Sequence, residues 1–150
     1  IDKFKASANF GQSYALGENL ASVTIDMAWG LLPAGTKVTD VDAFEREALT
    51  KSGLPFTLVP PRYRSAYYLH VFGGGYASGY YSYLWTEVLD DNIFDWFQAH
   101  GGMTRENGQR FRDLVISQGN TKPVGTFFTE FTGLTEPDMS SLLRSRGLAK

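Results

Sequence analysis

The chain has 150 residues, of which 43% are hydrophobic and 20% charged, and its net charge at pH 7 is −2. This length and composition are typical of one compact domain with a single core. The small net charge gives no basic patch for nucleic acid or an anionic membrane, and no apolar run approaches the roughly 20 residues that span a bilayer. Absence of cysteine excludes thiol catalysis, disulfides and cysteine-ligated metals, and agrees with a cytoplasmic location.

The chain begins Ile1-Asp2-Lys3, without an initiator methionine, and 15% of its residues are aromatic. Both features lead us to expect a piece of a larger polypeptide. Surfaces that such a piece once shared with the rest would be apolar. We therefore expect the isolated chain to associate with itself.

The hydrophobic periodicity in the first half of the chain predicts helices, in keeping with a mainly α fold. One helix is expected over 9–32 and another over 41–52, the latter capped by Thr39 or Asp40. The segment 56–72 contains locally strand-like residues, so a short strand pair is expected there at most.

The second half of the chain is also predicted to be helical. A helix is expected over 76–100, a second is capped by Thr104, and the last of two shorter ones is capped by Thr135 and ended by Gly147. No repeat, low-complexity tract or long linker divides the sequence. Residues 1–150 are therefore predicted to form a single helical domain.

The segment "HVFGGGYASGYYSYLW", residues 70–85, joins a histidine and three consecutive glycines to four tyrosines. A metal site within this chain is not indicated, because His70 and His100 are its only histidines and no H-E-x-x-H motif is present. A phosphate loop would need a lysine after its glycines, and Ser78 lacks the G-x-S-x-G frame of a serine nucleophile. The remaining chemistry is that of the tyrosines and the histidine.

If the helix begins near Tyr76, then Tyr76, Tyr80, Tyr83 and Glu87 share one helical face. Such an aromatic stripe is often buried core, with each hydroxyl bonded to a carbonyl. The alternative is a binding surface, since phenols are neutral hydrogen-bond donors at pH 7 and suit a developing oxyanion. The sequence alone leaves both interpretations open.

Three neighbouring residues also have both a purely structural and a functional interpretation. His70 is either a satisfied buried imidazole or a second donor toward the tyrosines. Arg62 and Arg64 are either solvated or able to bind a carboxylate through both guanidinium nitrogens.

The segments "VPPRYRSAYYLHVFGGGYASGYYSYLW", "GGMTRENGQRFRDLVISQGN" and "LLRSRGL" resemble the C-terminal part of the M3 zinc metallopeptidases. The resemblance is strongest to bacterial peptidyl-dipeptidases of the oligopeptidase A and thimet oligopeptidase superfamily, and it covers essentially the whole chain. It implies a large helical peptidase that cleaves short peptides with one zinc ion. The zinc ligands of that family lie before the equivalent of Ile1, so this chain is expected to bind no zinc by itself and to be inactive.

The resemblance also implies roles for individual residues. The substrate-side histidine and two tyrosines of the family correspond to His70, Tyr76 and Tyr83, which hydrogen-bond the substrate backbone and stabilise the tetrahedral intermediate. We assign Tyr83 to the oxyanion, and Tyr76 with His70 to neighbouring carbonyls. On one helix, Tyr76 and Tyr83 would have Cα atoms ~10 Å apart along the axis.

Further residues complete the predicted substrate-binding set: Gly74, Gly75, Tyr80, Arg62 and Arg64. The glycines are expected to form a flexible rim that closes on the peptide. The expected partners are short peptides and the missing N-terminal part of the same polypeptide, with no nucleic acid and no membrane. The alternative function is a free-standing helical module that binds a peptide or partner helix without catalysis.

Overall fold

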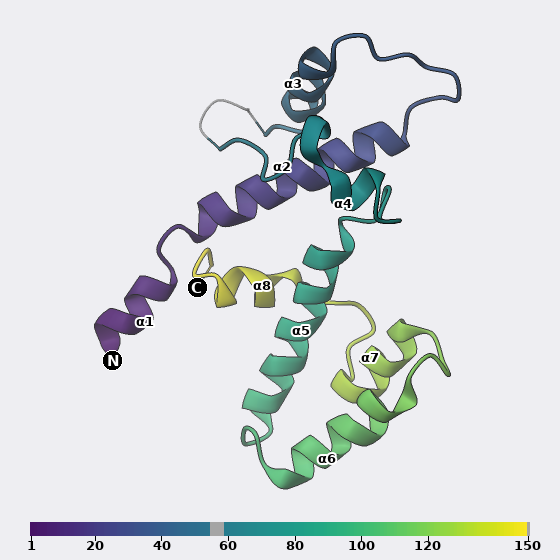
Figure 1. The fold of residues 1–150 in the computed structure, drawn as a ribbon. Coiled ribbons are helices and arrows are strands. Elements are labelled where there is room, and N and C mark those ends of the chain that lie inside the picture. Colours follow the sequence, from purple (N-terminus) through teal and green to yellow (C-terminus); the bar gives the residue numbers. More distant parts are fainter. Residues whose placement is uncertain (55–58, 150) are drawn as a thin grey trace. The chain divides into compact units, whose positions relative to one another are not determined.

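The computed structural model describes residues 1–54 and 59–149, and Figure 1 shows their course. The helical elements are α1 (Asp2–Ala8), α2 (Gln12–Gly30), α3 (Val41–Lys51), the 3₁₀ turn η1 (Ser65–Tyr67), α4 (Leu69–Phe72), α5 (Ser82–Ala99), α6 (Arg105–Leu114), the 3₁₀ turn η2 (Ile116–Gln118), α7 (Val124–Thr132) and α8 (Met139–Ser145). The described residues contain no strand, so the predicted mainly α fold is confirmed. Within the same ranges, no helix combines the length and apolar character needed to cross a bilayer.

The chain divides into two compact units, Ile1–Tyr83 and Leu84–Lys150. The boundary falls just after the start of α5, whose first two residues belong to the first unit. Each unit is described by itself below. The expectation of one helical domain stays a prediction.

The first unit is organised around the long helix α2, with α3 beside it (Figure 1). Ala21 and Ile25 of α2 are buried against Leu49 of α3. Trp29 packs on this core and also contacts Phe44 of α3, with ring centroids 4.5 Å apart. The predicted cap of α3 is confirmed, because the Asp40 carboxylate accepts a hydrogen bond from the Ala43 amide at 2.9 Å.

Several predicted boundaries were wrong, each for a local reason. The helix expected over 9–32 is interrupted before α2, where Gly11 takes a left-handed φ of 75°. No strand pair occurs in the described part of 56–72: residues 67–72, which are locally strand-like in sequence, belong to the helical stretch of η1 and α4, and residues 55–58 lie outside the described part. Thr135 does not cap the last helix, since Asp138 accepts from the Ser140 amide and α8 starts at Met139.

The second unit has an aromatic core. Phe97 of α5 and Phe131 of α7 are buried, and their ring centroids lie 5.7 Å apart. Phe111 of α6 packs edge-on against both rings, and α6 and α7 run side by side in Figure 1. Thr104 caps α6 as predicted, with its hydroxyl accepting from the Asn107 amide.

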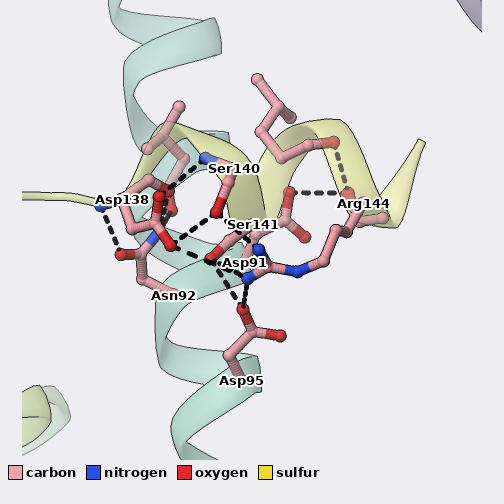
Figure 2. Close-up of polar contacts among 10 residues, drawn as sticks. Asp91, Asn92, Asp95, Asp138, Ser140, Ser141 and Arg144 are labelled. Atoms are coloured by element: carbon pink, nitrogen blue, oxygen red, sulfur yellow. Dashed lines mark hydrogen bonds and ion pairs between the residues drawn. The ribbon is translucent and has the colours of Figure 1, made fainter. Parts of the chain in front are cut away.

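Helix α8 is attached to α5 by polar contacts, which Figure 2 shows in close-up. Asn92 is only 2% exposed and bonds both backbone groups of Asp138: its amide donates to the carbonyl at 2.9 Å, and its oxygen accepts from the N–H at 2.8 Å. The buried amide is thus satisfied on both sides, which makes the contact specific in register.

Three acidic residues of α5 continue this attachment at intervals of four residues. Glu87 forms a two-pronged ion pair with Arg146, at 2.9 and 2.7 Å. Asp91 accepts from the Ser145 hydroxyl at 2.8 Å, and Asp95 accepts from Arg144 at 2.8 Å. One face of α5 therefore meets the C-terminal serines and arginines of the chain.

Burial, together with the charges of Glu87, Asp90 and Asp95, raises the pKa of Asp91 above its ordinary value, although the Ser145 hydroxyl opposes the shift. Folded Asp91 binds its proton more tightly than the unfolded residue, so its favourable contribution to stability is present below a pH of about 3.9 and is lost as pH rises through the folded-state pKa. Asp91→Asn keeps an oxygen for Ser145 but removes the charge. We expect the free energy of unfolding of Asp91→Asn, relative to the native chain, to increase between pH 4 and neutrality.

Urea unfolding at several pH values measures this difference. The control is Asp113→Asn, the same substitution at an exposed residue of α6 that accepts from Gln109. A difference for Asp91→Asn that does not change with pH, or that decreases as pH rises, would contradict the assignment.

Candidate active site

Three predicted residues lie together in the first unit and form what we call the His–Tyr cluster: His70, Tyr76 and Tyr83. The Nε2 atom of His70 and the hydroxyl of Tyr83 are 2.7 Å apart, a hydrogen bond between α4 and the start of α5. The Tyr76 ring stacks on His70 with centroids 4.7 Å apart, and it lies 6.0 Å from the Tyr83 ring at an angle of 20°. Tyr76 and Tyr83 remain 42% and 44% exposed, and His70 is also exposed. The cluster is a surface with polar tips, and its members are not sealed in the core.

A layer of buried tyrosines lies beneath the cluster. Tyr80 is 7% exposed and contacts the Tyr83 ring at 5.1 Å and the His70 ring edge-on at 5.9 Å. Tyr68, 1% exposed, packs edge-on against Tyr80, and Tyr63 stacks on Tyr68. The two interpretations of the aromatic segment thus apply to different residues, since Tyr80 and Tyr68 are core while the His–Tyr cluster is surface.

The turn that carries Tyr76 was not predicted correctly. Helix α5 begins at Ser82, so Tyr76 and Tyr80 lie in turns before it and do not share a helical face with Tyr83. The turn places the Tyr76 ring beside that of Tyr83, with the ring centroids 6.0 Å apart.

The backbone conformation after α4 requires glycine at two positions. A Cβ atom on Gly74 would lie 2.7 Å from the carbonyl oxygen of His70, and Gly75 has a left-handed φ of 79°. Only glycine allows both this close approach and this conformation without strain. Their predicted role as a rim that closes on a peptide stays a prediction.

A polar face of α2 holds the segment that carries the site. The Tyr63 amide donates to the Ser22 hydroxyl at 2.9 Å. One turn later, the Asp26 carboxylate accepts from the amide of Ser78 at 2.8 Å and from the amide of Tyr80 at 3.0 Å. The site therefore depends on a helix more than forty residues earlier in the sequence.

The two predicted arginines are both engaged with carboxylates. Arg64 pairs with Asp42 and with Glu45, which is 1% exposed, and the hydrogen bond to Glu45 raises the pKa of the Arg64 guanidinium. Arg62 pairs with Glu18 at 3.3 Å, and 55% of its side chain is exposed. Arg62 is therefore the more accessible of the two, and a carboxylate-binding role for either stays a prediction.

The pKa values of two tyrosines, Tyr80 and Tyr83, are raised. Desolvation raises the pKa of Tyr80, and desolvation with a smaller effect of the neighbouring Tyr76 side chain raises the pKa of Tyr83. A raised pKa keeps the Tyr83 phenol protonated well above neutral pH, so it can donate a hydrogen bond to an oxygen that becomes negatively charged.

The residues present do not fit a metal ion. No group of three His, Cys, Asp or Glu side chains with the geometry of a metal site occurs in the described ranges 1–54 and 59–149. His70 is bonded to Tyr83, and His100, in the second unit, contacts the Trp96 carbonyl through Nδ1 at 2.7 Å.

Sequence reasoning missed Asp26. The helix that contains Asp26 was predicted from its apolar residues alone, and the turn that Asp26 bonds was expected to be helical. A signal was available, because the polar residues Glu18, Ser22 and Asp26 recur every four residues and so lie on one face of the helix.

The sequence as a whole matches a known family of peptidases. The sequence model of peptidase family M3 matches residues 1–148. The chain therefore belongs to that family, which is a family of zinc metallopeptidases.

Several known peptidases are similar to this chain in sequence. The chain is 42% identical over 147 residues to the dipeptidyl carboxypeptidase of Salmonella typhimurium strain LT2, covering 98% of this chain and 22% of that protein. It is 41% identical to the dipeptidyl carboxypeptidase of Escherichia coli K12, covering 97% and 21%. Oligopeptidase A of E. coli K12 is 42% identical over 79 residues, covering 53% and 12%. The chain thus spans about a fifth of the length of the dipeptidyl carboxypeptidases that it matches.

The buried layer allows a direct test. The Tyr68 hydroxyl is buried and has no hydrogen-bond partner within the part of the chain that the structure describes. Removing an unsatisfied hydroxyl while keeping the ring relieves a desolvation cost, so we expect Tyr68→Phe to raise the free energy of unfolding by up to about 1 kcal/mol. Tyr67→Phe is the control, because Tyr67 is 57% exposed and its hydroxyl can reach water. Urea unfolding measures both variants, and a loss of more than about 1 kcal/mol in Tyr68→Phe would show that the hydroxyl is bonded.

Proposed function

We propose that this chain is the C-terminal segment of a zinc peptidase of the peptidyl-dipeptidase type, in which it binds the substrate backbone and stabilises the transition state. The observation that carries the proposal is the exposed His–Tyr cluster, with the 2.7 Å hydrogen bond between His70 and Tyr83. The dipeptidyl carboxypeptidases that match almost the whole chain support the type of activity. The zinc ion and its ligands would belong to polypeptide outside this chain, and the enzyme would be cytoplasmic.

The chemistry of the cluster follows from its hydrogen bonds. The Tyr83 hydroxyl donates to the oxygen that gains charge when the scissile carbonyl is attacked. The imidazole of His70 orients that hydroxyl, and the stacked ring of Tyr76 limits the motion of both side chains. Because the donors are held in place before the reaction, little reorganisation is needed when charge develops.

The remaining predicted residues would bind the rest of the peptide. For the Tyr83 proton to be free for the substrate, the Nε2–H of His70 donates to the Tyr83 oxygen. Of the two residues assigned to neighbouring carbonyls, Tyr76 would therefore be the donor, and Gly74 and Gly75 would form the rim of the peptide site. Arg62 is the better placed of the two arginines for a substrate carboxylate, since its ion pair with Glu18 is exposed and can exchange at low cost.

A domain exchange tests the function. The matching segment of the Salmonella dipeptidyl carboxypeptidase is replaced by this chain, and release of dipeptides from a short fluorogenic peptide is measured. We expect the hybrid to be active and the isolated chain to show no turnover with zinc. A folded, zinc-loaded hybrid without activity would contradict the proposal, and repurified isolated chain that keeps turnover would contradict the division of roles. An inactive hybrid that binds the peptide would favour a helical binding module.

Substitution of Tyr83 in the same hybrid tests the role of the cluster. Loss of one preorganised oxyanion donor typically costs about 2.7–4 kcal/mol, so Tyr83→Phe should lower kcat by roughly a hundredfold to a thousandfold. The control is Tyr81→Phe, which removes the hydroxyl of a 50% exposed tyrosine in the same segment and should keep kcat. Near-normal turnover in Tyr83→Phe would exclude it as the oxyanion donor.

We also propose that the isolated chain associates with itself. Large apolar side chains are exposed in the first unit, among them Phe4, Phe10, Leu31 and Leu69, which are 80%, 91%, 76% and 77% exposed. Exposed apolar side chains in this number are a drive toward association. Sedimentation velocity should show a rising average mass with concentration, and a monomer over the whole accessible range would refute this.

A further inference from the structure

Asp26 is a buried acid that forms hydrogen bonds with the turn that carries the site. It is 1% exposed, and its two carboxylate oxygens accept from different backbone amides, one from Ser78 and the other from Tyr80. Bonds from amides to an ionised carboxylate are stronger than those between neutral groups. Both donors lie between Tyr76 and Tyr83, so the carboxylate fixes the backbone between the two exposed tyrosines.

The same turn carries a strained residue. Ser78 is the one non-glycine residue with a positive φ in the described part of the chain, at 56°. Backbone strain of this kind persists where the surrounding structure holds it, and it is concentrated at functional sites. Here the amide of the strained residue is itself a donor to Asp26.

Helix α2 makes room for the turn one helical turn beyond Asp26. A Cβ atom on Gly30 would lie 1.8 Å from the Ser78 hydroxyl oxygen and 3.0 Å from the Ser78 Cβ. Asp26 and Gly30 are four residues apart and so lie on one face of the helix. The carboxylate attracts the turn, and the missing side chain of Gly30 lets it approach.

We infer that Asp26 is a positioning residue: it holds the turn of residues 76–81 so that the His–Tyr cluster keeps its stacked and hydrogen-bonded geometry. This inference rests on the proposed function, which gives the cluster its role toward substrate. Without the carboxylate, a turn that follows three glycines has many accessible conformations. The cluster would then form only part of the time.

Asp26→Asn tests the inference in the 150-residue chain. Asparagine keeps one acceptor but places a donor NH₂ against the second amide. We expect hydrogen exchange at the amides of Ser78 and Tyr80 to become at least tenfold faster. The ring signals of His70 in the NMR spectrum should shift, while those of His100, the other histidine, serve as the internal reference and stay in place.

Kinetics in the hybrid enzyme separate positioning from a loss of stability. We expect Asp26→Asn to lower kcat by about tenfold to a hundredfold with KM changed less than about threefold, because the donors are misplaced mainly in the transition state. The control is Asn92→Ala, which removes a buried side chain that joins α5 to α8 in the second unit and should leave kcat unchanged at temperatures where the hybrid stays folded.

Gly30→Ala is a second variant that leaves the carboxylate in place. The added methyl group displaces Ser78, so the His70 signals should again shift and kcat should fall. The double variant Gly30→Ala with Ser78→Gly removes the clashing atoms and supplies a residue suited to positive φ, and it should restore both readouts.

Three results would overturn the inference. Native amides of Ser78 and Tyr80 that exchange as fast as those of Gly74 and Gly75 would disprove the anchor. Unchanged His70 signals in a folded Asp26→Asn chain would disprove the link to the cluster, and equal losses of kcat in Asp26→Asn and Asn92→Ala would reduce Asp26 to a stabilising residue. The exchange and NMR results stand even if the native hybrid is inactive, which is the result that would refute the proposed function alone.

Discussion

The geometry of the candidate site depends on a buried carboxylate that bonds two backbone amides. Asp26 is deep in α2, and its partners Ser78 and Tyr80 are more than fifty residues later in the sequence. A buried charge is costly unless its hydrogen bonds are satisfied, so the turn and the helix each require the other. The exposed rings of Tyr76 and Tyr83 take their positions from this contact.

The two sides of the aromatic segment have different physical roles. Tyr68 and Tyr80 bury their rings and support the segment from below, whereas His70, Tyr76 and Tyr83 keep polar atoms within reach of solvent. Rings that stack at 4.7 and 6.0 Å lose little further freedom when a ligand binds. Such a surface has the properties that the proposed binding of a peptide backbone requires.

The sequence predicted local features well and long-range contacts poorly. The helical class and the caps at Asp40 and Thr104 followed from residue types and spacing and are confirmed. The roles of His70 and Tyr83 came from the family resemblance and stay predictions. The start of α5 was not predicted, because the sequence pattern after Gly75 is also compatible with a helix. Residues 76–81 form a turn instead, and its backbone is bonded to Asp26, a residue distant in the sequence. The pairing of Arg64 with Glu45 was not predicted either, because it also joins segments that are distant in the sequence.

The attachment of α8 to α5 has a consequence for how the chain responds to salt. Part of this attachment consists of ion pairs at partly exposed groups, such as Asp95 with Arg144, and mobile ions screen such pairs. The aromatic layer of Tyr68 and Tyr80 is held by apolar burial, which excluded salts such as sulfate strengthen. Ammonium sulfate would therefore weaken the ion pairs between α8 and α5 while strengthening the tyrosine layer and the burial of Leu142, so the attachment of α8 would depend more on its buried contacts.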